Sequence, residues 1–178
     1  MSFGMSLAQL TALHTAVSVV GLATGAFVLA AMLAARKPLG LTALFLVTTT
    51  LASVTAFMFP SKQLGLGHTV GVLSLGVLVP TLFAIAARPL TGRWRVVYVA
   101  GATAALYLNV VIGVLQLFAK LPALRPDGPL LTAPTFLAAQ LCVLLAFLAL
   151  GIVAVHRFHP PAHPSMVTGP PGAALTVR

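Results

Sequence analysis

The sequence is poor in acidic residues: Asp127 is the only one, against ten Lys and Arg. A carboxylate relay for proton pumping and the carboxylate ligands of a di-iron centre are therefore excluded. The single cysteine, Cys142, cannot form an intramolecular disulfide. The sequence also lacks a serine-nucleophile motif, a Walker motif, HExxH and CxxC. General acid and base chemistry would have to rest on His14, His68 or Lys120 alone, which argues against a hydrolase.

Apolar residues dominate what is present. They make up 60% of the chain and charged residues only 6%, whereas about 25% charged residues is usual in a globular protein. Five charge-free stretches each exceed the roughly 20 residues that a membrane-spanning helix needs. We therefore predict an all-α membrane protein, a bundle of five transmembrane helices with approximate spans 7–35, 39–60, 66–87, 96–119 and 132–156.

The domain organisation follows from these spans. Residues 1–158 are expected to form a single transmembrane domain, because 178 residues leave no room for a soluble domain beside five spans. Residues 1–15 contain no Lys or Arg, so we interpret the first segment as a retained helix rather than a signal peptide. Residues 159–178 are rich in Pro and Gly and are expected to form a cytoplasmic tail that is disordered in isolation.

The basic residues predict the orientation. Lys and Arg near span ends stay on the cytoplasmic side, which predicts an N-terminus outside and a C-terminus inside, in the inner membrane of a bacterium. Because the positive charges lie in short connections, the net charge of +9 does not indicate nucleic-acid binding. The expected inner group comprises Arg36, Lys37, Arg88, Arg93, Arg95, Arg157 and Arg178, and the outer group Lys62, Lys120 and Arg125.

Three further residues are expected to anchor the protein at the membrane surface. Trp94 and Tyr98 lie beside Arg93 and Arg95, as in the aromatic belts found at membrane interfaces. Lys120 ends the fourth span, where its side chain can extend to the interface. The connection after it, residues 121–134, contains three prolines and is expected to be an irregular outer loop that covers the bundle.

Polar residues within the spans are the candidates for chemistry. With a rise of about 1.5 Å per residue, His14 and Gln140 are expected roughly 10 to 12 Å below the outer surface. On the same scale Gln116 lies about 5 Å deep, Asn109 near the midplane and His68 near the interface. This clustering predicts a polar cavity open toward the outside. Helical spacing places His14 on a stripe with Ser18, Gly21 and Gly25, and Asn109 on one with Gly113, Gln116 and Lys120.

Two interpretations of these residues remain open. Polar side chains between membrane helices often act only as hydrogen-bonding glue, worth about 0.6 kcal/mol on average, and this explanation suits Asn109 and Gln140. An ionisable residue deep in a membrane is, by contrast, a candidate functional residue by default. His14 is the strongest candidate of that kind.

A cofactor is the chemical alternative. His14 and His68 could be the two axial ligands of a b-type haem, since imidazoles from two helices can hold a macrocycle. Their expected depths differ by roughly 10 Å, which opposes this. A quinone or lipid headgroup held by His14, Asn109, Gln116 or Gln140 demands less geometry. A second group, His156, His159 and His163, matches no metal-binding motif of defined geometry.

Several stretches resemble a family of small predicted inner-membrane proteins of bacteria that has no assigned activity. The similarity covers roughly residues 10 to 158 and implies that the equivalents of His14, His68, Asn109, Gln116 and Lys120 recur in the family. In the fourth connection, this chain has RPDGPLLTAPT where the family has a more acidic, Gln-containing segment. The stretches are LHTAVSVVGLATG, TALFLVTTTLASVTAFMFP, GHTVGVLSLGVL, GRWRVVYVAGATAALYLNVVIGVLQLFAKLPAL and APTFLAAQLCVLLAFLALGIVAVHRF.

Small-residue packing faces and the lack of a catalytic constellation favour one function. We expect a non-catalytic accessory or structural subunit that packs against a larger membrane complex or against copies of itself. The alternative is a redox protein that binds haem b or quinone in the outer polar cavity. Both readings place the protein in a lipid bilayer.

Overall fold

The protein is all-α and has five helices long and apolar enough to cross a membrane, which confirms the predicted fold class. The computed structural model describes residues 4–60, 65–86 and 90–159. The predicted tail, apart from His159, lies outside these residues. The helices are α1 (Leu7–Leu33), α2 (Leu39–Ala56), α3 (Leu66–Ala86), α4 (Gly92–Lys120) and α5 (Pro134–Arg157). This is a multi-pass membrane protein.

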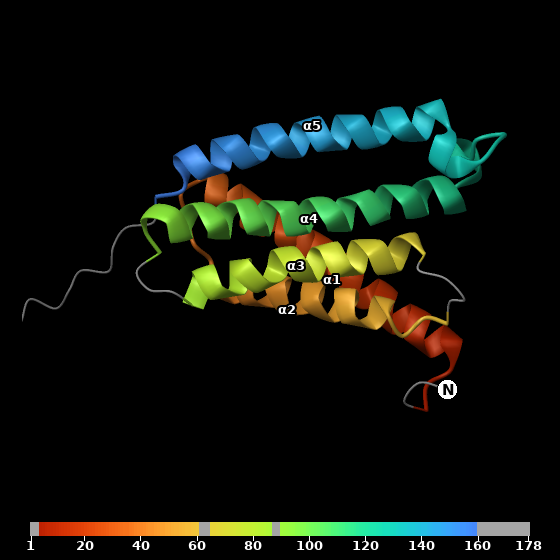
Figure 1. Cartoon of the computed structure of the whole chain (residues 1–178), viewed down its shortest axis with the longest axis horizontal. Coiled ribbons are helices and arrows are strands. Elements are labelled where there is room, and N and C mark those ends of the chain that lie inside the picture. The colour runs from red at the N-terminus through yellow and green to blue at the C-terminus, as the bar shows by residue number, and fades with distance from the viewer. Residues whose placement is uncertain (1–3, 61–64, 87–89, 160–178) are drawn as a thin grey trace, which may run out of the picture.

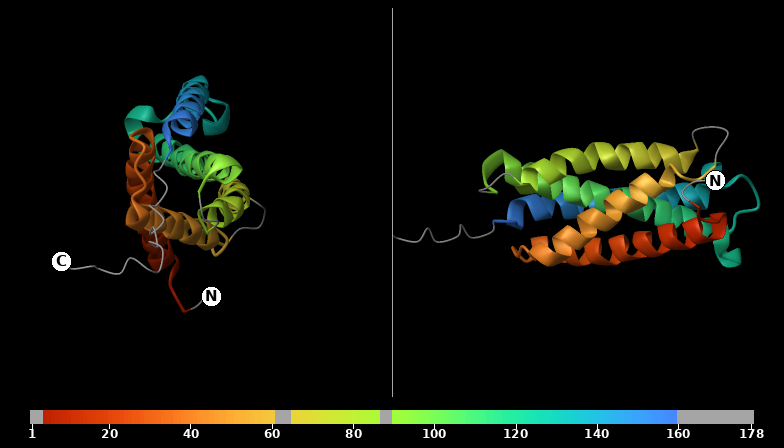
Figure 2. Two further views of the ribbon diagram at one scale, coloured as in Figure 1. Left: turned by 90° about the vertical axis from the view of Figure 1, so that its left-hand side faces the viewer. Right: turned by 90° about the horizontal axis from the view of Figure 1, so that it is seen from below.

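The helices run antiparallel to their neighbours in sequence, so the first and last described residues lie at opposite ends of the bundle (Figure 1). Seen along the bundle, α1 to α4 surround a common centre, and α5 lies outside them against α4 (Figure 2). Contacts of α1 with α2 and α4, and of α3 with α2 and α4, close this four-helix arrangement. We call the end at which α1 begins the N-terminal end of the bundle.

Local sequence signals explain where the helices start and stop. Ser6 and Gln9 form a reciprocal capping box that starts α1. Ala35 ends it in the left-handed region, with φ of 56°, as Arg36 N–H donates to the Ala31 carbonyl at 2.8 Å.

Because the residue before a proline disfavours helix, Pro60 keeps α2 from reaching the predicted residue 60. Pro134 opens α5 at a position where a missing N–H costs nothing.

Glycines allow the helices of the four-helix arrangement to approach closely. A Cβ atom at Gly25 would lie 2.7 Å from side-chain carbons of both Leu106 in α4 and Phe45 in α2. At Gly101 of α4 it would lie 2.0 Å from Oγ1 of Thr81 in α3. Both approaches are too close for any residue with a side chain, in keeping with the role of small residues between membrane helices.

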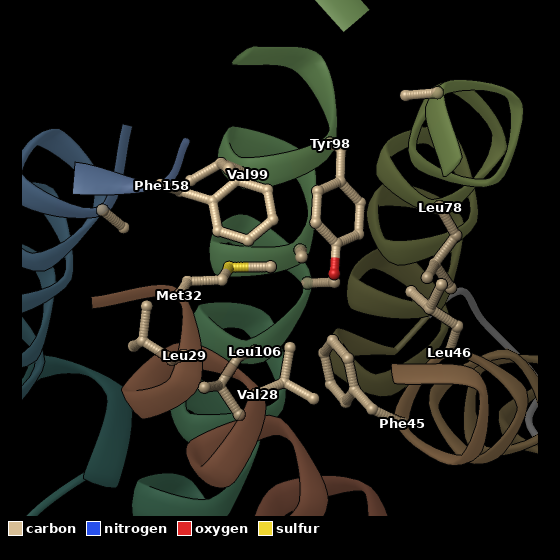
Figure 3. Packing of buried hydrophobic residues seen from close by; sticks show 14 of the residues in the cluster. Val28, Leu29, Met32, Phe45, Leu46, Leu78, Tyr98, Val99, Leu106 and Phe158 are labelled. Carbon is tan, nitrogen blue, oxygen red and sulfur yellow. The ribbon is translucent and has the colours of Figure 1, made fainter. Parts of the chain in front are cut away.

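The largest buried side chains pack together in one cluster (Figure 3). Most come from the end of α1 and the first half of α2 and of α4, which places the cluster toward the end opposite the N-terminal end. Because lipid tails are as apolar as these side chains, van der Waals packing rather than transfer from water holds them together. The cluster therefore depends on close fit. It includes Val28 and Met32 from α1, Phe45 from α2, Leu78 from α3, Tyr98 and Val99 from α4, and Phe158 after α5.

Tyr98, which the sequence predicted at the membrane surface, belongs to this cluster. Its side chain is 1% exposed, and its hydroxyl lies 3.3 Å from Oγ1 of Thr42, which is also buried. Trp94, one helical turn earlier, is 48% exposed and lies on the surface. The difference arises because Thr42 of α2 and Phe158 after α5 pack against Tyr98, and sequence spacing does not reveal such contacts.

Candidate functional site

A small polar cavity lies among α1, α2, α3 and α4, with a volume of about 70 Å³. Each of the four helices supplies at least one polar side chain to it, and α5 supplies none. Two of the predicted site residues, His14 and Asn109, are brought together here. The polar residues that line the cavity are His14 and Ser18 from α1, Ser53 from α2, Ser74 from α3 and Asn109 from α4.

His14 is held in place by α2. Its Nδ1 lies 2.8 Å from Oγ1 of Thr55, and its ring meets Phe59 edge-on at 5.3 Å. Thr55 has one hydroxyl hydrogen, which it donates to the Leu51 carbonyl at 2.8 Å. With the Thr55 hydrogen on the Leu51 carbonyl, the tautomer of His14 that fits carries its hydrogen on Nδ1. In the neutral ring, Nε2 is then left with a free lone pair.

Asn109 connects α4 to α2. Its side-chain N–H donates to Oγ1 of Thr49 at 3.0 Å, so its Oδ1 is left to accept from another group. Oδ1 has no hydrogen-bond donor among the described residues. This position agrees with the hydrogen-bonding role expected for Asn109, and it leaves one acceptor toward the cavity.

Two serines that line the cavity were not singled out from the sequence. Ser53 donates to the carbonyl of Thr49 at 2.9 Å, and Ser74 is 2% exposed without any hydrogen bond within the part of the chain that the structure describes. Ser74 continues the spacing of Gly67 and Gly71 along one side of α3. This spacing was the sequence signal that could have identified Ser74, but a single serine in an apolar helix does not by itself indicate a site.

The other predicted site residues lie elsewhere. His68 is half-buried near the start of α3 and contacts the ring of Phe57 at 5.8 Å, not the cavity. Gln116 is exposed. The hydrogen bond between Asn109 and Thr49 shows that these two residues lie at the same height in the bundle. Seven residues after each of them, α2 ends at Ala56 and α4 reaches Gln116, so α2 does not continue far enough to cover Gln116. Lys120, in the last turn of α4, is exposed as well.

Gln140 lies at the contact between α5 and α4 rather than in the polar cavity. Its side-chain N–H donates to the carbonyl of Val111 at 3.1 Å, and its Oε1 is buried without a partner among the described residues. Thr103 Oγ1, also at the contact between α4 and α5, is the other such orphaned atom. The polar groups of α5 thus serve helix packing, so the cavity draws on four helices and not five.

Two apolar grooves flank α5. One, with a volume of about 380 Å³, lies between α4 and α5 and is lined by Thr103, Tyr107, Leu144, Leu148, Ile152 and His156, among others. We call it the α4–α5 groove. The second, of about 340 Å³, lies between α1, α4 and α5. Phe147 borders both, so α5 touches the rest of the bundle along a narrow seam.

The geometry of the polar cavity does not suit haem or a quinone. Sites for drug-sized ligands measure about 300 to 1,000 Å³, several times the 70 Å³ present here. A quinone presents carbonyl oxygens and needs hydrogen-bond donors. Most of the polar groups that line the cavity already donate a hydrogen to another partner. The two histidines of the haem hypothesis contact different aromatic rings, and His68 does not reach the cavity.

The remaining sequence candidates add no further site. Within residues 4–60, 65–86 and 90–159, no group of three His, Cys, Asp or Glu side chains could hold a metal ion. His156 and His159 are exposed, and His163 lies outside the described residues. The fourth connection forms two short 3₁₀ turns, Pro122–Leu124 against α4 and Leu130–Thr132 against α5. Neither turn lines the polar cavity, so the loop does not cover it.

Comparisons with protein families, with curated proteins and with solved structures find no match to this chain. The resemblance to the bacterial inner-membrane family rests on the sequence stretches alone.

Proposed function

We propose that this protein is a non-catalytic accessory or structural subunit of a larger membrane complex, with α5 as its docking helix. The observation that carries the proposal is the small share of α5 that the bundle buries: Phe136 and Ala154 are its only buried residues among 24. A helix held this weakly by its own chain has most of its surface available to a neighbour.

The seam between α4 and α5 supports a protein neighbour. Two buried polar atoms there, Thr103 Oγ1 and Gln140 Oε1, have no partner among the described residues, so the polar groups of this seam are incompletely paired. Thr103 and Tyr107 also line the α4–α5 groove. A transmembrane helix seated in that groove would fill about 380 Å³ of apolar space.

We place the protein in the inner membrane of a bacterium, with its N-terminus outside and its C-terminus inside. The support is the excess of Lys and Arg in the first and third connections and after α5. This orientation puts residues 159–178 in the cytoplasm, where a Pro-rich tail is suited to a second contact with the complex.

Co-purification in a mild detergent tests the proposal. We expect the full chain to elute in an assembly larger than itself, and Leu148→Trp to release it, because Leu148 lines the α4–α5 groove. Leu73→Trp is the matched control. Leu73 and Leu148 are 53% and 54% exposed, but Leu73 faces away from both grooves and the polar cavity.

Three results are informative. Loss of a heterologous partner in Leu148→Trp, with no loss in Leu73→Trp, supports the subunit proposal. A larger species that contains only this chain indicates a homo-oligomer through the same groove. A monodisperse monomer that is unaffected by either substitution contradicts the proposal.

A further inference from the structure

We propose that the polar cavity among α1 to α4 is a binding site for a small monovalent cation, held by neutral acceptor atoms. The site is independent of the docking surface on α5, because α5 contributes nothing to its lining.

The hydrogen bonds around the cavity leave an excess of acceptors. Ser18 donates its hydroxyl hydrogen to the carbonyl of His14 at 2.7 Å, and Ser53 donates its own to the carbonyl of Thr49 at 2.9 Å. Each hydroxyl oxygen retains lone pairs. With the Nδ1 hydrogen of His14 donated to Thr55 and one of the two amide hydrogens of Asn109 donated to Thr49, Nε2 and Oδ1 are acceptors as well, and one amide hydrogen remains.

Ser74 provides the second, independent observation that indicates a ligand in the cavity. Its side chain lines the cavity, is 2% exposed, and makes no hydrogen bond within the described residues. Serines within helices commonly bond the carbonyl four residues earlier, as Ser18 and Ser53 do here. The Ser74 oxygen is not among the fully buried orphaned atoms, so it is accessible from the cavity, and a hydroxyl kept off the backbone at the cavity wall is available to a ligand there.

The chemistry of the lining selects the class of guest. The acceptor atoms of the four helices outnumber the two hydrogens left free, one on Asn109 Nδ2 and one on the Ser74 hydroxyl, so the lining favours a group that is positive or rich in hydrogens over an anion. Neutral oxygen dipoles can replace part of the hydration shell of a monovalent cation inside a membrane. An ammonium ion would donate to Nε2, Oδ1 and the serine oxygens, whereas sodium would be coordinated by the oxygens.

The size of the cavity fits this class. At about 30 Å³ of liquid volume per water, 70 Å³ holds roughly two waters, so a small ion can enter with part of its hydration shell. Retained water lowers the cost of placing a charge where the described lining offers no carboxylate.

Thermal unfolding of the purified full chain, in detergent at constant ionic strength, tests the site. Choline chloride, whose cation is too large for the cavity, is replaced stepwise by ammonium, sodium or potassium chloride. We expect a saturable rise in unfolding temperature with at least one of the three. The strongest effect with ammonium indicates hydrogen-bond donation, and the strongest effect with sodium or potassium indicates oxygen coordination.

Ser74→Ala is the decisive variant, because it removes only a hydroxyl that makes no hydrogen bond within the described residues, and its own unfolding temperature in choline serves as its baseline. We expect the apparent affinity for the cation to fall by roughly tenfold, the value of one hydrogen bond to a charged group. Thr50→Val is the control, since Thr50 bonds only its own helix and does not line the cavity. Asn109→Asp should tighten binding, because it adds a negative charge to the site.

Two results would overturn the proposal. One is an unfolding temperature that no small cation raises above its value in choline. The other is a rise that Ser74→Ala and Thr50→Val preserve equally, which would place the effect outside the cavity.

Discussion

Nδ1 of His14 in α1 lies 2.8 Å from Oγ1 of Thr55 in α2, although 41 residues separate them in the sequence. The bond joins the N-terminal end of α1 to the last turns of α2 beside the polar cavity. This hydrogen bond fixes the orientation of the His14 ring and determines which ring nitrogen can contact a ligand in the cavity. A histidine that seemed isolated in the sequence is thus part of a two-helix contact.

A double-mutant cycle measures this contact. His14→Leu and Thr55→Val should each destabilise the protein, and their effects should be coupled by about 0.6 kcal/mol and at most about 1.7 kcal/mol, as for other hydrogen bonds between membrane helices. Reversible unfolding in a detergent and denaturant mixture provides the free energies. Strict additivity would mean that the two side chains do not interact in the membrane.

The approach of α3 and α4 at Gly101 predicts a sharp steric effect. Gly101→Ala should destabilise the bundle by about 1 to 3 kcal/mol, because the new Cβ would lie 2.0 Å from Oγ1 of the fully buried Thr81. Gly76→Ala in α3 is the control, since its Cβ would meet nothing within 4 Å. Equal unfolding temperatures for the two variants would show that α3 and α4 are further apart. Gly113, whose Cβ would lie 3.7 Å from Leu22, should tolerate alanine.

Arg95 should hold the end of α5. Its Nη1 donates to the carbonyls of Val155 and Phe158, where the helix leaves carbonyls without partners. Arg95→Leu should cost about 1.5 to 3 kcal/mol, as for a hydrogen bond from a charged group, and should speed hydrogen exchange in the last turn of α5. Arg93→Leu, at an exposed position in the same turn of α4, should change stability by less than about 0.5 kcal/mol. Unchanged exchange in Arg95→Leu would contradict the role.

The orientation can be tested with fused reporters. A reporter that is active only in the periplasm should work before Met1 and after Leu64, and one active only in the cytoplasm should work after Arg178. The basis is the charge distribution between the two sides. The reverse pattern would invert the bundle and place the polar cavity nearer the cytoplasm.

Absorption spectroscopy tests the redox alternative. We expect the purified protein to show no reduced-minus-oxidised Soret or α band, because a cavity of about 70 Å³ cannot hold a porphyrin. A haem spectrum that His14→Ala abolishes would overturn both this prediction and the cation site.

The sequence alone determined the fold class and, within a few residues, the helices. Five apolar runs longer than a bilayer leave the backbone no alternative to helix, since no water is available to satisfy its polar groups. Proline and the Ser6 capping box set several helix ends for purely local reasons. His14 was also identified as a candidate from depth and helical spacing, both of which follow from one-dimensional periodicity.

The tertiary structure decided which polar residues meet. Spacing along one helix defines its faces but not which neighbour covers them, so Asn109 and Gln116 shared a stripe although only Asn109 lines the cavity. Tyr98 was expected at the surface and is buried, because its exposure depends on how α2 and the residue after α5 pack around it. Ser74 gained its importance only when three other helices placed acceptors opposite it. Contacts between helices depend on packing in three dimensions, which the pattern of a single helix does not contain.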